Sequence, residues 1–354
     1  MKTRPAAPLT RLRERAEQLA VLLPKTRLHP RVLEWAENSS RRARWCVAFS
    51  GGADSLSLLL LIWAHWPERR GRLRVLHFNH RLRGAASRGD ALFCRKVCAE
   101  LGVDFFGGEW REAKKGASEA EARAARLEFF SQHSRSLWQG HQQDDVAETM
   151  LMRIARGSGT AGLAAPRPVQ SMPGGRTHLR PLLTLKKKEV LTALRKLGVS
   201  WREDASNAAD DFFRNRVRRS VVPRWQLAAG RDVLAGAALA RELLEEDDSA
   251  LEEWLAELQP FNARGALDLA KLKGRPKALV RRALRLWLGR QRGVGELARQ
   301  GFESLLEAVR LARPTRQSLG ANVFAVIKGN ELALARREAG TFRKAFRRFP
   351  RRAN

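Results

Sequence analysis

Residues 45–55 read WCVAFSGGADS, and this segment decides the predicted fold of the chain. The apolar run 45–49 is short and uninterrupted, which is typical of a strand that is buried on both faces. Gly51 and Gly52 let the backbone turn tightly and let a ligand come close without meeting a Cβ atom. A helical pattern begins immediately after the turn. The segment therefore predicts a strand, a tight turn and a helix in direct succession.

Such a turn favours a bound anion, because the first amides of a helix are unpaired and the helix dipole is positive there. The pattern is not a Walker loop, since no Gly-Lys-Ser/Thr follows, and it lacks the third glycine of a dinucleotide fingerprint. A simple capped helix, with Ser50 or Asp54 as the cap, is the alternative. We predict a phosphate cradle made of Ser50, Gly51, Gly52, Ala53, Asp54 and Ser55.

Asp54 is unusual in a phosphate site, because its carboxylate repels a phosphate group. A Mg²⁺ ion that bridges the carboxylate and the phosphate oxygens would remove this conflict. Asp54 is therefore the predicted ligand of a Mg²⁺ ion.

Further apolar runs follow the first one at intervals of about 30 residues, as in successive strand–helix–strand units. The runs cover 73–78, 103–106 and 136–139, with helical patterns near 54–66, 88–101, 119–134 and 144–156. This alternation predicts an α/β fold, with a parallel sheet and helices on both of its faces. Because such sheets bind ligands at the carboxyl ends of their strands, functional residues are expected just after each strand.

The alternation stops near Pro223, and the small-residue stretch 228–240 marks a predicted domain boundary. Beyond it, long helical patterns predict a mainly α-helical second domain, and Gly329-Asn330 joins two strand-like pieces into a hairpin. The predicted parts are a basic N-terminal extension (1–43), a catalytic α/β domain (44–225), a mainly helical RNA-binding domain with a terminal hairpin (226–338), and an Arg-rich tail (339–354).

The composition points to a polyanionic partner. The 354 residues include 67 Lys and Arg, 53 of them Arg, against 37 Asp and Glu, which gives a formal charge of +30. Arginine suits phosphate groups and stacks on bases, so nucleic acid is favoured over a general compositional bias. A hydrophobic share of 44% excludes a disordered chain. The sequence lacks an apolar run long enough for a membrane span, and three cysteines favour a reducing, cytoplasmic location.

Two acids follow the fourth predicted strand. Asp145 and Glu148 lie three residues apart, so they share one face of the predicted helix 144–156. This carboxylate pair could hold an ammonium group, orient a base or share a Mg²⁺ ion. The alternative is an ordinary helix start, with a capping acid and acids in its first turn.

Several arginines are candidates for phosphate or RNA contacts. Arg123 and Arg126 lie one turn apart, and Arg214 and Arg218 share a helical face, whereas Arg216 points elsewhere. Exposed arginine-rich helices are the alternative in a chain with this composition. In the C-terminal part we expect phosphate contacts from Arg281, Arg282 and Arg285, and core packing of Trp254 and Trp287.

Histidines complete the candidate set. His77, His80 and His141, together with Asn207, are expected to bond a nucleotide, RNA or backbone. A metal site at His77 and His80 is disfavoured by their loose spacing. Cys94 and Cys98 are predicted to form a buried helix face, because a metal site would need more ligands.

The turn SGGADS resembles the SGGxDS motif of the N-type ATP pyrophosphatase (PP-loop) superfamily, whose members split ATP into AMP and pyrophosphate. Later segments narrow the resemblance. They read HFNHRLR at 77–83, EARAAR at 121–126, GHQQDDVAET at 140–149, EDASN at 203–207 and FRNRVR at 213–218. Together they are similar to the tRNA(Ile)-lysidine synthase family, strongly over 44–225 and more weakly over 240–335.

The resemblance implies an ATP-dependent ligase that modifies the wobble cytidine of an isoleucine tRNA with a CAU anticodon. ATP adenylates the C2 oxygen of that base, and free L-lysine then displaces AMP to give lysidine. ATP and Mg²⁺ are the implied cofactors. One alternative is another PP-loop tRNA modification such as thiolation, although clustered cysteine pairs are missing from this sequence. Another is a tRNA-binding protein that keeps a degenerate ATP site.

Overall fold

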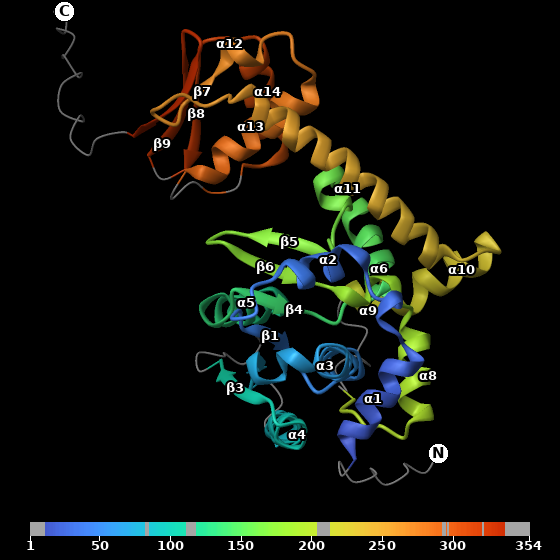
Figure 1. Cartoon of the computed structure of the whole chain (residues 1–354). Coiled ribbons are helices and arrows are strands. Elements are labelled where there is room, and N and C mark those ends of the chain that lie inside the picture. The colour runs from blue at the N-terminus through green and yellow to red at the C-terminus, as the bar shows by residue number, and fades with distance from the viewer. Residues whose placement is uncertain are drawn as a thin grey trace, which may run out of the picture. The chain divides into compact units, whose positions relative to one another are not determined.

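The computed structural model describes residues 11–81, 85–110, 118–203, 213–291, 295, 297–320 and 322–336. The chain divides into two compact units, Met1–Glu246 and Asp247–Asn354, each of which is described by itself. Figure 1 shows the helices and strands of both units. Within the described residues, no helix combines the length and apolar character needed to cross a membrane.

The first unit is built on a six-stranded sheet in the order β3-β2-β1-β4-β6-β5. Its strands are β1 (Trp45–Ala48), β2 (Leu73–Asn79), β3 (Asp104–Glu109), β4 (Ser136–Trp138), β5 (Val169–Met172) and β6 (Arg176–Leu179). All neighbours pair in parallel except β5, which runs antiparallel to β6. The four predicted strands are confirmed. The β5–β6 hairpin was not predicted, because its two strands are short and largely polar.

Helices cover both faces of this sheet, as predicted. The α-helices of this unit that precede α11 are α1 (Leu12–Leu22), α2 (Pro30–Asn38), α3 (Ala53–His65), α4 (Ala85–Leu101), α5 (Glu119–His133), α6 (Gln143–Ile154), α7 (Thr160–Leu163), α8 (Lys187–Lys196), α9 (Phe213–Arg216) and α10 (Val222–Ala229). Trp45 and Val47 of β1 pack in the core that also contains α1, α3 and α8, whereas Cys46 packs with Phe129 and Phe130 of α5. Burial on both faces explains why this strand is apolar throughout.

The helices α1 and α2 pack into the core of the first unit. Leu12, Ala16 and Leu19 of α1 are buried in its main core, and α1 lies beside α3 and α8 in Figure 1. Because α3 is apolar all round, its outer side needs such a cover. Residues that precede position 44 thus contribute to the core of this unit.

The stretch 228–240, expected to mark a boundary, is helical apart from residues 230–232. It contributes to α10 and to α11 (Val233–Leu258), and Gly230 with φ +60° separates the two helices. Alanine is the best helix former, which explains why a small-residue stretch folds in this way. The two compact units divide between Glu246 and Asp247, within α11.

The second unit combines helices with a small antiparallel sheet in the order β7-β10-β9-β8. After α11 its elements are β7 (Leu267–Asp268), α12 (Leu269–Leu272), α13 (Lys277–Arg290), α14 (Arg299–Arg310), β8 (Thr315–Gly320), β9 (Val323–Lys328) and β10 (Glu331–Arg336). The predicted hairpin at Gly329-Asn330 is confirmed. Trp287 lies in the core as expected, but the expectation for Trp254 was wrong, since 39% of its surface is exposed.

Candidate functional site

The turn between β1 and α3 is held in shape by its own hydroxyl groups. The Ser50 amide donates to Ser55 Oγ at 3.2 Å, and the Gly52 amide donates to Ser50 Oγ at 3.3 Å. Ser55 Oγ in turn donates to the Gly52 carbonyl at 3.1 Å. Gly52 is the N-cap, and no side chain caps α3. The serines therefore shape the loop, and the first-turn amides of α3 remain as the groups suited to an anion.

Two glycines are required by the geometry of this turn. Gly51 adopts a φ of +86°, in the left-handed region that favours glycine. Gly140, two residues after the end of β4, lies against the start of α3. A Cβ atom there would come 2.6 Å from the carbonyl oxygen of Asp54 and 2.9 Å from its carbonyl carbon. Glycine at this position lets the end of β4 and the phosphate loop come into contact.

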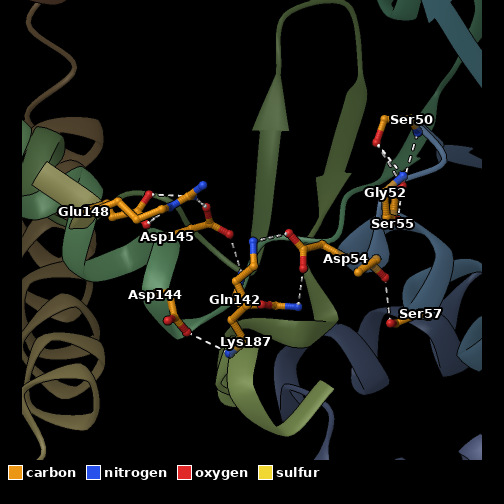
Figure 2. Close-up of polar contacts among 12 residues, drawn as sticks. Ser50, Gly52, Asp54, Ser55, Ser57, Gln142, Asp144, Asp145, Glu148 and Lys187 are labelled. Atoms are coloured by element: carbon orange, nitrogen blue, oxygen red, sulfur yellow. Dashed lines mark hydrogen bonds and ion pairs between the residues drawn. The ribbon is translucent and has the colours of Figure 1, made fainter. Parts of the chain in front are cut away.

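Asp54 lies at the centre of the polar contacts in Figure 2, between the serine loop and the acids of α6. Its carboxylate accepts from Gln142 Nε2 and from Lys187 Nζ, each at 3.2 Å. Burial raises the pKa of the Asp54 carboxyl; the Lys187 ammonium opposes this rise, and Asp145 adds to it. A partly buried carboxylate beside another acid suits a divalent cation, which stabilises its charged form. The geometry thus fits the Mg²⁺ role predicted for Asp54.

Asp145 and Glu148 of α6 bind Arg214 and Arg218 in one cluster. Arg214 donates to Asp145 at 2.7 Å and to Glu148 at 2.8 Å, and Arg218 donates to both oxygens of Glu148 at 2.5 and 2.9 Å. The side chain of Glu148 is only 2% exposed. Arg218 lies in a π-helical turn, Val217–Val221, a geometry that is frequent at functional sites. Both acids share one face with one pair of arginines, as their spacings indicated.

Asp145 also has a local role. One of its oxygens accepts the amide of Gln142, the N-cap residue of α6, at 2.9 Å. The capping alternative considered from the sequence therefore applies to Asp145 in addition to its ion pair. Asp144 ties the same helix start to α8, because it accepts the amide of Lys187 at 2.8 Å.

A second cluster beside the acids consists of cations. The Arg180 side chain is buried, and it donates to His141 Nδ1 at 3.3 Å and to the carbonyl of Arg167 at 2.7 Å. Burial lowers the pKa of Arg180 to about 10, and nearby Arg123 and Arg153 contribute. Arg123 is exposed and makes no ion pair with any residue that the structure describes. This cluster of like charges, hereafter the cationic cluster (Arg123, Arg153, Arg180), suits a polyanion.

His141 is neutral in this environment. Burial, followed by the charges of Arg180 and Arg214, holds its pKa well below the ordinary value. Because Arg180 can only donate, His141 Nδ1 is the acceptor and its proton resides on Nε2. Arg126, one turn after Arg123 on α5, also lies close enough to lower the pKa of His141.

The other predicted histidines follow β2. The ring of His77 is buried, and its Nδ1 bonds the carbonyl of Phe49 at 2.9 Å, next to the phosphate loop. His80 packs edge-on against Phe78. No group of three or more metal-binding side chains occurs among the residues that the structure describes, and Cys94 and Cys98 are buried as expected. Asn207 lies outside the described residues.

The arginines of the second unit that were expected to contact RNA form ion pairs or ring contacts with residues of the same unit. Arg281 pairs with Glu303 at 3.4 Å, and Arg282 pairs with the buried Asp248. Arg285 lies over the ring of Phe302. These contacts give each of them a structural partner, so an RNA contact of any of them stays a prediction.

Sequence reasoning missed Lys187, Gln142, Gly140 and Arg180 as members of the site. Gln142 and Gly140 lie in the GHQQDD segment and follow a strand end, so their position was a usable signal. Lys187 was hidden in a run of three lysines that reads as a helix start. Arg180, just after the unpredicted β6, carried no local signal at all.

The chain matches known families over both units. Residues 24–225 match the PP-loop domain family, and residues 267–319 match the TilS substrate binding domain family. The first match covers more than half of the chain.

Curated relatives include tRNA(Ile)-lysidine synthases of three bacteria. That of Symbiobacterium thermophilum is 35% identical over 78% of this chain and 61% of its own length. That of Solibacter usitatus is 38% identical over 71% of this chain and 59% of its own length. That of Pseudomonas aeruginosa is 33% identical over 81% of this chain and 68% of its own length. The chain thus spans about three fifths of the length of the first two.

Among solved structures, the U34-tRNA thiolase NcsA of Methanococcus maripaludis aligns over 66% of this chain and 78% of its own. The identity is 18% and the TM-score is 0.48. A similarity of this size supports no functional conclusion.

Proposed function

The chain belongs to the tRNA(Ile)-lysidine synthase family, and from this premise we propose that it ligates free L-lysine to the wobble cytidine of an isoleucine tRNA. In the first step, the C2 oxygen of the base attacks the α-phosphorus of ATP, and pyrophosphate leaves. In the second step, an amine of lysine attacks C2, and the oxygen leaves with AMP. The observation that carries this proposal is the position of Asp54, which joins the phosphate loop to Gln142 at the start of α6 and to Lys187 of α8.

The phosphate loop supplies the ATP site of this proposal. The first-turn amides of α3 point their partial positive charge at the phosphates, and the serine bonds fix the loop before ligand arrives. Lys187 adds a full positive charge beside Asp54, where negative charge develops as pyrophosphate leaves. Asp54 would hold a Mg²⁺ ion, which neutralises phosphate charge when bound.

The acid–arginine cluster supplies the lysine site. A free amino acid carries an ammonium and a carboxylate on the same carbon atom, and the cluster offers both matching charges. Asp145 and Glu148 suit the ammonium, whereas Arg214 and Arg218 suit the carboxylate. Held by its head group, lysine would have its side-chain amine free to reach C2 of the cytidine. That amine has to be unprotonated to act as a nucleophile.

The cationic cluster supplies the RNA contacts close to the reaction. Arg123, Arg153 and Arg180 repel one another in the free protein, and phosphate groups of an anticodon loop would relieve this repulsion. The neutral His141 offers an N–H donor at Nε2 beside these cations. Such a donor suits the edge of a cytosine that is splayed out of the loop.

The thiolation alternative is disfavoured by the cysteines. Cys46, Cys94 and Cys98 are the three cysteines of the chain, and all are buried. Burial raises the pKa of the Cys46 thiol to about 11 and that of Cys98 to about 12. A sulfur carrier needs an accessible thiolate, and none of these cysteines offers one.

The decisive experiment incubates an isoleucine tRNA with a CAU anticodon together with ATP, Mg²⁺ and labelled lysine. We expect label on the RNA, and AMP and pyrophosphate in equal amounts to it. A tRNA with uridine at the wobble position is the matched control and should stay unlabelled. Pyrophosphate release without any transfer of label to the RNA, or modification by a sulfur donor in place of lysine, would contradict the proposal.

A further inference from the structure

The phosphate loop is held from outside by a residue that belongs to neither of the two clusters. Arg202 lies in the segment after α8, and its backbone amide donates to the carbonyl of Gly51 at 2.9 Å. Its side chain crosses to α4, where Nε donates to the carboxylate of Asp90 at 2.7 Å. One residue therefore connects the segment after α8, the phosphate loop and α4.

The packing around Gly51 is tight on the same side. A Cβ atom at Gly51 would come 3.2 Å from Phe93, 3.3 Å from Cys94 and 3.3 Å from Cγ of Arg202. Phe93 and Cys94 belong to α4, so the loop lies between that helix and the Arg202 side chain. The carboxylate of Asp90 is only 11% exposed, and the Arg202 side chain is 43% exposed.

We infer that Arg202 is a positioning residue for ATP, which acts by clamping the phosphate loop against α4 through its ion pair with Asp90. The inference rests on the proposed function in one respect, namely that the loop binds the phosphates of ATP. Gly51 precedes the helix amides that would face those phosphates. A loop that moves away from α4 would spread these amides, and binding would then carry the entropy cost of ordering them.

The ion pair fixes the size of the expected effect. A partly exposed ion pair contributes only a modest free energy to holding the loop. The clamp is therefore expected to change ATP affinity about fivefold rather than a hundredfold. The effect should fall on affinity alone, because the Arg202 side chain contacts the loop and α4 and neither acid of α6. Turnover at saturating ATP should therefore stay unchanged.

The test measures equilibrium binding of α,β-methylene-ATP with Mg²⁺ to the full chain. Arg202→Gln should raise the Kd about fivefold, Arg202→Lys should restore most of the affinity, and Arg27→Gln should have no effect. Arg27 is the matched control, since it pairs with Glu189 at 2.6 Å and has a similar exposure of 46%. An Arg202→Gln protein that binds the analogue like the unmodified chain overturns the inference.

Asp90→Asn separates a clamp from a direct phosphate ligand. If Arg202 clamps the loop, Asp90→Asn weakens binding as Arg202→Gln does, and the double variant is no weaker than either single variant. If the Arg202 side chain binds phosphate itself, Asp90→Asn frees it and binding stays equal or becomes tighter, which overturns the clamp.

Steady-state assays give a second readout on the tRNA reaction. The clamp predicts a raised KM for ATP, with kcat and the KM for tRNA unchanged, whereas partial unfolding lowers kcat. The binding measurements use neither tRNA nor lysine. If the unmodified protein failed to form lysidine, the binding measurements would therefore still test the clamp.

Discussion

The carboxylate of Asp54 lies 3.2 Å from the ammonium of Lys187, although 133 positions separate the two residues in the sequence. This contact brings the start of α3 and the start of α8 together at the carboxyl end of the sheet. Asp144 reinforces it by accepting the Lys187 amide. Lys187 thus occupies a fixed position beside the phosphate loop, set by one contact of its backbone and one of its side chain.

Replacement of Lys187 by Met should change the pH dependence of the reaction. Burial already raises the pKa of Asp54, and Lys187 opposes that rise, so its removal raises this pKa further. Asp54 must be ionised to hold Mg²⁺, and activity is lost as pH falls through its pKa. We expect the acidic limb of kcat/KM for ATP to move to higher pH. An unchanged limb would contradict the role given to this pair.

Replacement of Asp54 by Asn should separate activity from stability. The variant should lose at least ~100-fold in adenylation, the scale of a missing charge-stabilising group. In the unmodified protein the raised pKa means that the folded state binds the proton more tightly. Asp54 therefore favours folding at low pH, and this contribution fades as pH rises from the unfolded pKa to the folded one. Unfolding titrations across that window should show this pH dependence of the free energy of unfolding in the unmodified protein. The Asp54→Asn variant should lack it.

Glu148→Gln should destabilise the first unit. Glu148 is buried and accepts from two arginines, so its removal leaves both without their main anionic partner. We expect a loss of about 2–3 kcal/mol, below the range for fully buried pairs because the arginines are partly exposed. Thermal unfolding would measure it. Adding Arg218→Met should restore part of the stability but none of the activity, and a stable Glu148→Gln protein would refute the assigned coupling.

Arg123→Gln should weaken tRNA binding without loss of stability. Arg123 is exposed and adds to the repulsion around Arg153 and Arg180, so the fold does not depend on it. We expect the KM for tRNA to rise and the dependence of log Kd on log salt to fall by about 1. Arg41→Gln, at another exposed arginine, is the control. Equal salt slopes for Arg123→Gln and the unmodified protein would exclude a phosphate contact.

Gly140→Ala should impair the site through the backbone alone. The added methyl group would meet the Asp54 carbonyl at 2.6 Å, and the backbone on one side has to shift. A destabilisation of about 1–3 kcal/mol is typical of such overpacking. ATP affinity should fall with it. Gly71→Ala, where nothing lies within 4 Å of the added atom, should leave stability and affinity unchanged.

Local patterns in the sequence sufficed for the core of the fold. The four parallel strands and the shared face of Asp145 and Glu148 follow from short-range spacing, and the structure confirms them. The family follows from the resemblance of the quoted motifs, and the comparisons confirm it. The hairpin at Gly329 likewise follows from its turn residues.

Local patterns in the sequence did not predict the contacts between residues that are distant in the chain. Nothing in the lysine run around Lys187 indicates that one member faces Asp54, because the contact depends on how the whole sheet brings α3 and α8 together. The serine hydroxyls of the phosphate loop bond within the loop, which residue type alone does not reveal. The expectation for Trp254 was wrong because an apolar ring on an amphipathic helix does not specify how closely its neighbours cover it.

The burial of α3 has a consequence for synthesis of the chain. This helix is apolar on every side, and α8, one of the helices that cover it, is translated more than a hundred residues later. At the usual speed of protein synthesis, that interval is on the order of ten seconds. This apolar segment stays only partly covered for that long, so the nascent polypeptide exposes a chaperone-binding segment at the helix of the proposed nucleotide site.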